Sequence, residues 1–283
     1  MSKRLKKLVE EALAIEACDA KEAGSIGYMA RVLTQATMPH RKIVGNQFTR
    51  SNGVFKLSIL APSEIGLPYG TIPRLLLSWL TTEAVRTKQS EIVLGHTLGK
   101  FMSQLGLTST GGRNGTIGRL QDQMQRLFSS TISCHYVKDA KISGAMGFNI
   151  AKEYHLWWES ERTEQPSSWQ STVTLSHDFF EELITSPVPI DMRALRLLRA
   201  SAMALDVYCW LTYRMSYLKK TTAIPWEVLE VQFGCDFERT CDFKKKFLKQ
   251  LRIISVIYPQ AKIEDSGTCL ILRPSKPHVP MFA

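Results

Sequence analysis

One order of secondary-structure elements is indicated twice in this chain of 283 residues, and it constrains the fold more than any other feature of the sequence. The order is a helix, a short strand, a second helix, a turn, a third helix and a hairpin. Hydrophobic spacing indicates it over residues 73–158 and again, after a polar stretch, over residues 173–273. Two copies of this order are typical of two winged-helix units. The sequence therefore predicts an α+β fold with two tandem winged-helix domains, preceded by a short helical arm.

The first copy begins with a helix predicted at residues 73–88, with Pro73 in its first turn, where proline is favoured. A strand is predicted at residues 91–94. The helix that follows has Thr97 as its expected N-cap and ends at Gly106.

The rest of the first copy is a helix at residues 117–128 and a hairpin. The hairpin strands are predicted at 132–136 and 148–158, with the loop 138–147 as the expected wing. The stretch 159–171 is polar and without pattern, so it is the best candidate for a domain boundary.

The second copy begins with a strand at residues 173–175 and a short helix near 179–184. A long helical region at 191–218 and a helix at 225–233 that Gly234 ends follow. A further helix is predicted at 237–253, and a hairpin at 256–273 completes the order.

The domain division that follows is an arm and linker at residues 1–44, a first winged-helix domain at 45–165 and a second at 166–283. Residues 5–16 of the arm are predicted to form an amphipathic helix. Its apolar stripe consists of Leu5, Leu8, Val9, Ala12 and Leu13. A helix this short needs a surface to dock on, either on its own chain, which is favoured, or on a second copy in a monomer–dimer equilibrium.

The helix at 117–128 has a polar face opposite its apolar stripe and follows the loop Thr-Gly-Gly-Arg-Asn-Gly. Arginine and glutamine can bind guanine and adenine edges in a major groove, and backbone N–H groups at a helix start can bind phosphate. The alternative is an ordinary solvated face. The candidate DNA-binding residues here are Arg113, Asn114, Thr116, Arg119, Gln123 and Arg126.

The helix at 237–253 carries a denser cationic face, while Lys244 falls nearer its apolar stripe. The chain has 36 Lys+Arg against 26 Asp+Glu, a net charge of +10, which favours nucleic acid or an acidic membrane surface as a partner. The DNA-binding candidates on this helix are Arg239, Lys245, Lys246, Lys249 and Arg252. Those on the two expected wings are Lys138, Lys141 and Lys262.

Signals for catalysis, metal binding and membrane insertion are weak. The stretch 95–100 resembles a phosphate loop but lacks the Ser or Thr after its lysine, and the six histidines do not pair at metal-ligand spacings. We therefore expect no enzyme activity, no metal and no cofactor. The longest apolar run is about six residues against the ~20 that a membrane span needs. Six cysteines are too few for a disulfide scaffold, which favours a reduced, cytoplasmic setting.

Several segments are similar to the plasmid-encoded RepA type of replication initiator. They are residues 67–84, which begin Leu-Pro-Tyr-Gly-Thr-Ile-Pro-Arg, residues 111–128, residues 186–195 and residues 204–214. The likeness extends over roughly residues 45–275.

This resemblance implies a protein that binds repeated duplex sequences (iterons) at a plasmid origin and helps to open an adjacent AT-rich stretch. It also implies recruitment of the host replication initiator and of the replicative helicase or its loader, association with the plasmid in the bacterial nucleoid, and, as in many such proteins, repression of its own promoter as a dimer. Two alternatives stay open. One is a winged-helix transcriptional repressor without initiator activity, and the other is a replication enzyme such as a nicking relaxase or a primase.

Overall fold

The computed structural model describes residues 3–95, 97–112, 115–138, 141–156, 171–234 and 237–280. Helices and strands alternate along the chain and the described strands form antiparallel sheets, so the fold is α+β as predicted. A single apolar core cluster includes residues from both halves of the sequence.

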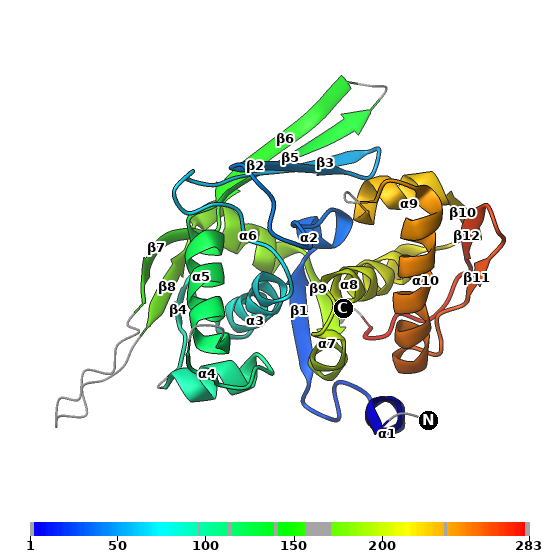
Figure 1. Ribbon diagram of the computed structural model, residues 1–283, viewed down its shortest axis with the longest axis horizontal. Helices are drawn as coiled ribbons and strands as arrows, with labels where there is room; N and C mark the ends of the chain where they lie inside the picture. Colours follow the sequence, from blue (N-terminus) through cyan, green and yellow to red (C-terminus); the bar gives the residue numbers. More distant parts are fainter. Residues whose placement is uncertain are drawn as a thin grey trace.

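The first half contains a helix–strand–helix–helix–strand–strand series (Figure 1). Its members are α3 (Ile72–Thr87), β4 (Glu91–Val93), α4 (Leu98–Gln104), α5 (Thr116–Phe128), β7 (Ala151–His155) and β8 (Thr172–Leu175). The three strands form a sheet of order β4-β8-β7, in which the last strand of the series lies in the middle. Pro73 lies in the first turn of α3, and Thr97 Oγ1 accepts a hydrogen bond from Lys100 N at the start of α4, as predicted.

The second half repeats this series and its strand order. Its members are α8 (Ala202–Tyr217), β10 (Thr222–Pro225), α9 (Trp226–Phe233), α10 (Thr240–Ile257), β11 (Ile263–Asp265) and β12 (Cys269–Leu272). The sheet order is β10-β12-β11, so again the last strand is central. In Figure 1, α5 and α10 stand roughly upright toward the two ends of the long axis, with α3, β1, β9 and α8 between them.

The hairpin expected as the first wing lies in a different sheet. Its strands β5 (Thr131–Lys138) and β6 (Lys141–Asn149) join β2 (Gln47–Ser51) and β3 (Phe55–Leu60) in a four-stranded sheet of order β2-β3-β5-β6. The predicted strand 148–158 divides at the buried Ile150, where the chain leaves β6 and enters β7 in the other sheet. The alternating pattern continues through the division, so it did not reveal the change of partner.

The proposed boundary between residues 165 and 166 falls in the connection between β7 and β8. These two strands pair directly, with Tyr154 opposite Val173. Most of that connection lies outside the described residues. In the described part, residues on both sides of the boundary belong to one sheet.

The segment expected to be a linker before residue 44 contributes to the core. It contains β1 (Ile26–Ala30) and α2 (Arg31–Gln35), and β1 pairs antiparallel with β9 (Pro187–Asp191). Met29, Val32 and Leu33 are buried. The ladder links segments about 160 residues apart, with Gly27 opposite Ile190; local periodicity carries no signal for such a pairing.

The remaining helices cover this framework. They are α1 (Lys3–Ala17), α6 (His177–Thr185) and α7 (Met192–Leu198). Helix α1 packs on α7 and α10 of its own chain, the favoured expectation for the arm. Ala12 and Ile15 form its buried face, whereas Leu13, which the sequence placed in the apolar stripe, is 58% exposed.

Candidate nucleic-acid interface

Helix α10 presents a row of cations to solvent because its apolar residues repeat on the opposite side. Phe243, Phe247 and Leu251 are buried against the core. The exposed cations are Lys245, Lys246, Lys249 and Arg252. None of the four forms an ion pair within the described chain. All four charges are therefore available to phosphate.

Lys244 connects α10 to the short turn between β11 and β12. Its Nζ donates a hydrogen bond to the Gly267 carbonyl over 2.6 Å and lies 2.9 Å from Asp265 Oδ1. The ammonium also lies 5.0 Å from the centroid of the Trp226 ring, and Trp226 Nε1 donates to the same carboxylate. This cluster holds the turn, the second expected wing, against the base of the cationic helix.

The other candidates near α10 differ in how free they are. Arg239 is exposed but forms an ion pair with Asp242, with 2.7 Å between Nη2 and Oδ2. Lys262 is exposed at the entrance to β11.

On α5 the structure corrects the expected polar face. Arg119 is exposed, as predicted. Gln123 is only 4% exposed, and its Oε1 accepts a hydrogen bond from Tyr69 N over 2.8 Å. Arg126 pairs with Asp122 and lies over the Tyr69 ring. Gln123 and Arg126 therefore hold the loop before α3 in place, and the packing of that loop, invisible to helical periodicity, turns them away from solvent.

The loop before α5 is closed by threonine hydroxyls. Thr116 Oγ1 donates to the Thr108 carbonyl and lies 3.0 Å from Thr110 Oγ1. A Cβ at Gly115 would lie 2.3 Å from the Thr110 carbonyl oxygen, so only glycine fits this approach. The hydroxyl of Thr116 is thus occupied in building the loop, while Gly111 and Gly112 are exposed on it.

Four candidates are not placed in full. Arg113 and Asn114 lie outside the described residues. Lys138 and Lys141 are located by their backbone only, at the facing ends of β5 and β6. They therefore belong to the four-stranded sheet and not to the β4-β8-β7 sheet.

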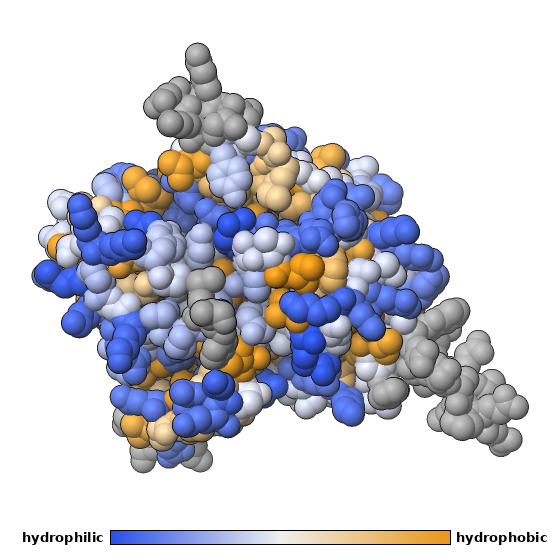
Figure 2. Space-filling model, turned by 180° about the vertical axis from the view of Figure 1, so that it is seen from behind, coloured by the Kyte–Doolittle hydropathy of each residue, from blue (hydrophilic) through white to orange (hydrophobic). Residues whose placement is uncertain are grey.

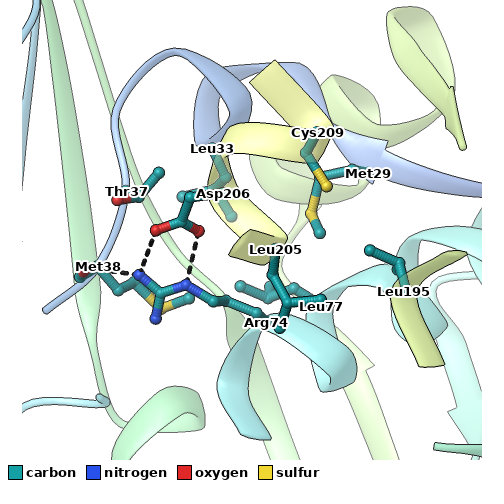
Figure 3. A pocket seen from close by; sticks show the side chains of 10 residues that line it. All are labelled: Met29, Leu33, Thr37, Met38, Arg74, Leu77, Leu195, Leu205, Asp206 and Cys209. Carbon is teal, nitrogen blue, oxygen red and sulfur yellow. Dashed lines mark hydrogen bonds and ion pairs between the residues drawn. The ribbon is translucent and has the colours of Figure 1, made fainter. Parts of the chain in front are cut away.

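A buried polar cluster joins the two repeated series, and no motif in the sequence predicts it. Arg74 of α3 and Asp206 of α8 form a two-point ion pair (Figure 3). His40 Nε2 lies 2.8 Å from Asp206 Oδ2. Burial opposes ionisation of Asp206, yet Arg74 and His40 lower its pKa to about 2. Burial lowers the pKa of His40. The one available signal was a single charge within each of two apolar stretches.

The larger hollows among the described residues are open to solvent, with volumes of about 450 Å³ beside Phe148 and Glu181 and about 390 Å³ beside Trp79 and Lys100. The cavity beside Arg74 and Asp206 has a volume of about 10 Å³, near the minimum for one water molecule (Figure 3). Within the described ranges, no three His, Cys, Asp or Glu side chains are grouped as metal ligands. No described helix has both the length and the apolar character to cross a bilayer.

The fold and surface define a class: an α+β protein that repeats one helix-and-sheet series and presents an exposed cationic helix. The model of the plasmid-encoded RepA protein family matches residues 67–227, more than half of the chain. The chain belongs to this family of plasmid replication proteins. No curated protein matches it.

Solved structures with a similar fold include two crystal structures of domains 2 and 3 of RctB. One, of residues 155–483, has a TM-score of 0.53 at 12% identity and covers 86% of this chain and 96% of its own. The other, a selenomethionine derivative, has a TM-score of 0.57 at 15% identity, with coverage of 88% and 97%. At this identity the likeness is one of fold.

Proposed function

We propose that this protein initiates plasmid replication by binding repeated duplex sequences at the origin through two winged-helix units. The units are the two helix–strand–helix–helix–strand–strand series, with α5 and α10 as their recognition helices. The observation that carries the proposal is the repeated sheet order, β4-β8-β7 and β10-β12-β11, in a chain that exposes four unpaired cations on α10. Family membership supports the replication role.

The two helices have different tasks in this proposal. Helix α10 supplies phosphate contacts through Lys245, Lys246, Lys249 and Arg252, which give affinity and salt dependence. On α5, Arg119 is the remaining exposed candidate for a base edge, since Gln123 is engaged with Tyr69. The turn held by Lys244 contacts the backbone beside α10, as wings do.

The protein acts by binding and carries out no chemistry of its own. Once bound, it opens the adjacent AT-rich stretch and recruits the host replication initiator and the replicative helicase or its loader. It also represses its own promoter as a dimer, and it works in the cytoplasm on the plasmid in the nucleoid. These steps follow from the family resemblance.

The salt dependence of DNA binding tests the role of α10. Substituting Lys245, Lys249 and Arg252 with alanine should weaken binding to all duplexes and lower the slope of log K against log salt by ~0.9 for each lost contact. A matched control removes three exposed lysines elsewhere, Lys56, Lys88 and Lys220. An equal change of slope in both variants would refute a specific role for this face.

A second assay separates an initiator from a repressor. Purified protein on a supercoiled plasmid origin should make the AT-rich stretch reactive to permanganate, whereas a repressor would bind without this reactivity. A nicked product in the presence of magnesium would refute the non-enzymatic role.

Replacing Arg119 with alanine tests base recognition by α5. Arg119→Ala should cost ~1–3 kcal/mol of binding free energy on DNA with the preferred base alone. Equal losses on cognate and random DNA would make Arg119 a backbone contact.

A further inference from the structure

All N–H donors of the buried Arg74 guanidinium are hydrogen-bonded where α3 meets α8. Arg74 Nε donates to Asp206 Oδ1 over 2.6 Å, and Nη2 donates to Oδ2 over 2.7 Å. The remaining N–H groups donate to the carbonyls of Met38, Gly70 and Pro39. The Arg74 side chain is 3% exposed and that of Asp206 is 6% exposed.

Stability alone does not account for this arrangement. Removing two charges from water costs several kcal/mol for each ion, and apolar replacements of similar volume are often neutral or stabilising. An apolar pair makes contacts that do not depend on the orientation of its two side chains. A two-point guanidinium–carboxylate pair fixes both the distance and the rotation between the two groups that it joins.

The two partners come from the elements on which the two recognition helices rest. Helix α5 packs on α3, and α10 packs on α8. The relative rotation of α3 and α8 therefore sets the relative placement of α5 and α10. Figure 3 shows the carboxylate of Asp206 facing the guanidinium of Arg74 across the boundary between these helices.

The other polar links between the halves are less restrictive, and they include single hydrogen bonds from Arg196 to the Gln104 carbonyl and from Gln232 to the Gln35 carbonyl. The β1–β9 ladder joins five residue pairs, with β1 beside α3 and β9 beside α8. Two-stranded ribbons twist more variably than larger sheets. The shared apolar core and this ladder hold the halves together without a directional polar contact between α3 and α8. The two-point Arg74–Asp206 pair, with His40 bonded to the same carboxylate, supplies that contact.

We infer that Arg74 and Asp206 are positioning residues that set the spacing and rotation between α5 and α10, and so determine which separation of two DNA half-sites the protein accepts. The inference rests on the proposed function, duplex binding through both helices. It adds a specificity determinant that touches no DNA.

The test uses the full chain and duplexes obtained by selecting wild-type protein on a random-sequence library. Two base pairs inserted between the half-sites rotate one against the other by roughly 70° at 10–10.5 bp per turn. Wild-type affinity should fall at least tenfold on this insertion. In the Arg74→Met/Asp206→Leu variant it should fall less than threefold, with affinity for each isolated half-site unchanged.

The matched control is Arg86→Met/Glu83→Gln, which removes an ion pair within α3 and should keep the wild-type insertion penalty. A folded Arg74→Met/Asp206→Leu variant with the full penalty would overturn the inference. If that variant does not fold, Arg74→Lys retains the charge without the two-point geometry and should show an intermediate penalty; a wild-type penalty would again overturn it. Failure of the wild-type selection to yield any duplex sequence would instead refute the proposed function.

Discussion

At the scale of single residues, burial changes what charged and polar side chains do. Gln123 and Arg126 lie on a helix face that the sequence suggested for DNA, yet both hold the loop at Tyr69. His278, near the C-terminus, is enclosed by two tyrosines, and its Nδ1 lies 2.7 Å from the Tyr208 hydroxyl, while its ring packs on Tyr258. Burial lowers the pKa of His278 to about 4.

This histidine makes folding stability depend on pH. Its pKa is about 4 in the folded chain against an ordinary value of 6.5, so the unfolded chain binds the proton first as pH falls. The contribution of His278 to the free energy of unfolding is fully present above pH 6.5. It is lost between pH 6.5 and pH 4, by roughly 3 kcal/mol at the lower limit. His278→Gln should lose less over this interval in urea unfolding. His177→Gln, at an exposed position on α6, should behave as the wild type, and the same loss in both variants would contradict the assignment.

At the scale of elements, α10 and the turn between β11 and β12 are joined as one unit. Lys244 lies on the side of α10 between its buried phenylalanines and its exposed lysines. Its ammonium lies over the Trp226 ring and reaches Asp265 and Gly267. The neighbouring Lys245 is exposed. Of these two adjacent lysines, Lys244 is bonded to the turn and Lys245 is exposed to solvent.

Replacing Lys244 should loosen the turn between β11 and β12 and leave α10 intact. In Lys244→Met, amide hydrogen exchange at residues 265–269 should accelerate about tenfold, since a hydrogen bond from a charged donor contributes ~1.5–3 kcal/mol. Exchange along α10 should stay as in the wild type. Lys245→Met is the matched control and should change neither segment; unchanged exchange in Lys244→Met would show that the turn holds itself.

At the scale of the whole molecule, the N-terminal arm docks on its own chain. Arg193 of α7 donates to the carbonyls of Ala14 and Cys18 at the end of α1 and pairs with Asp191, at 2.7 Å. On the face seen in Figure 2, apolar residues form small separate patches among hydrophilic ones. That face therefore offers little apolar area for a stable subunit interface.

Loss of the Arg193 contacts should free the arm without changing the assembly. In Arg193→Met, exchange at residues 8–17 should rise at least tenfold, while the sedimentation coefficient at micromolar concentration stays that of the wild type. Arg196→Met, on the same helix, should leave α1 protected, since Arg196 donates to the Gln104 carbonyl instead. A change in sedimentation for Arg193→Met alone would show that the arm takes part in dimer formation.

Sequence alone was sufficient for whatever depends on local spacing. The cationic face of α10, the proline in the first turn of α3 and the N-cap of α4 were predicted from the sequence. Helical residues 3.6 positions apart share a face, and helix starts favour particular side chains. Only the tertiary structure decided the contacts between distant segments: the β1–β9 ladder, the transfer of β5 and β6 to another sheet, and the Arg74–Asp206 pair, whose members are 132 residues apart. The physical reason is that hydrophobic periodicity indicates which side chains are buried. The residues that they contact depend on how distant elements pack, and the neighbouring sequence does not determine that packing.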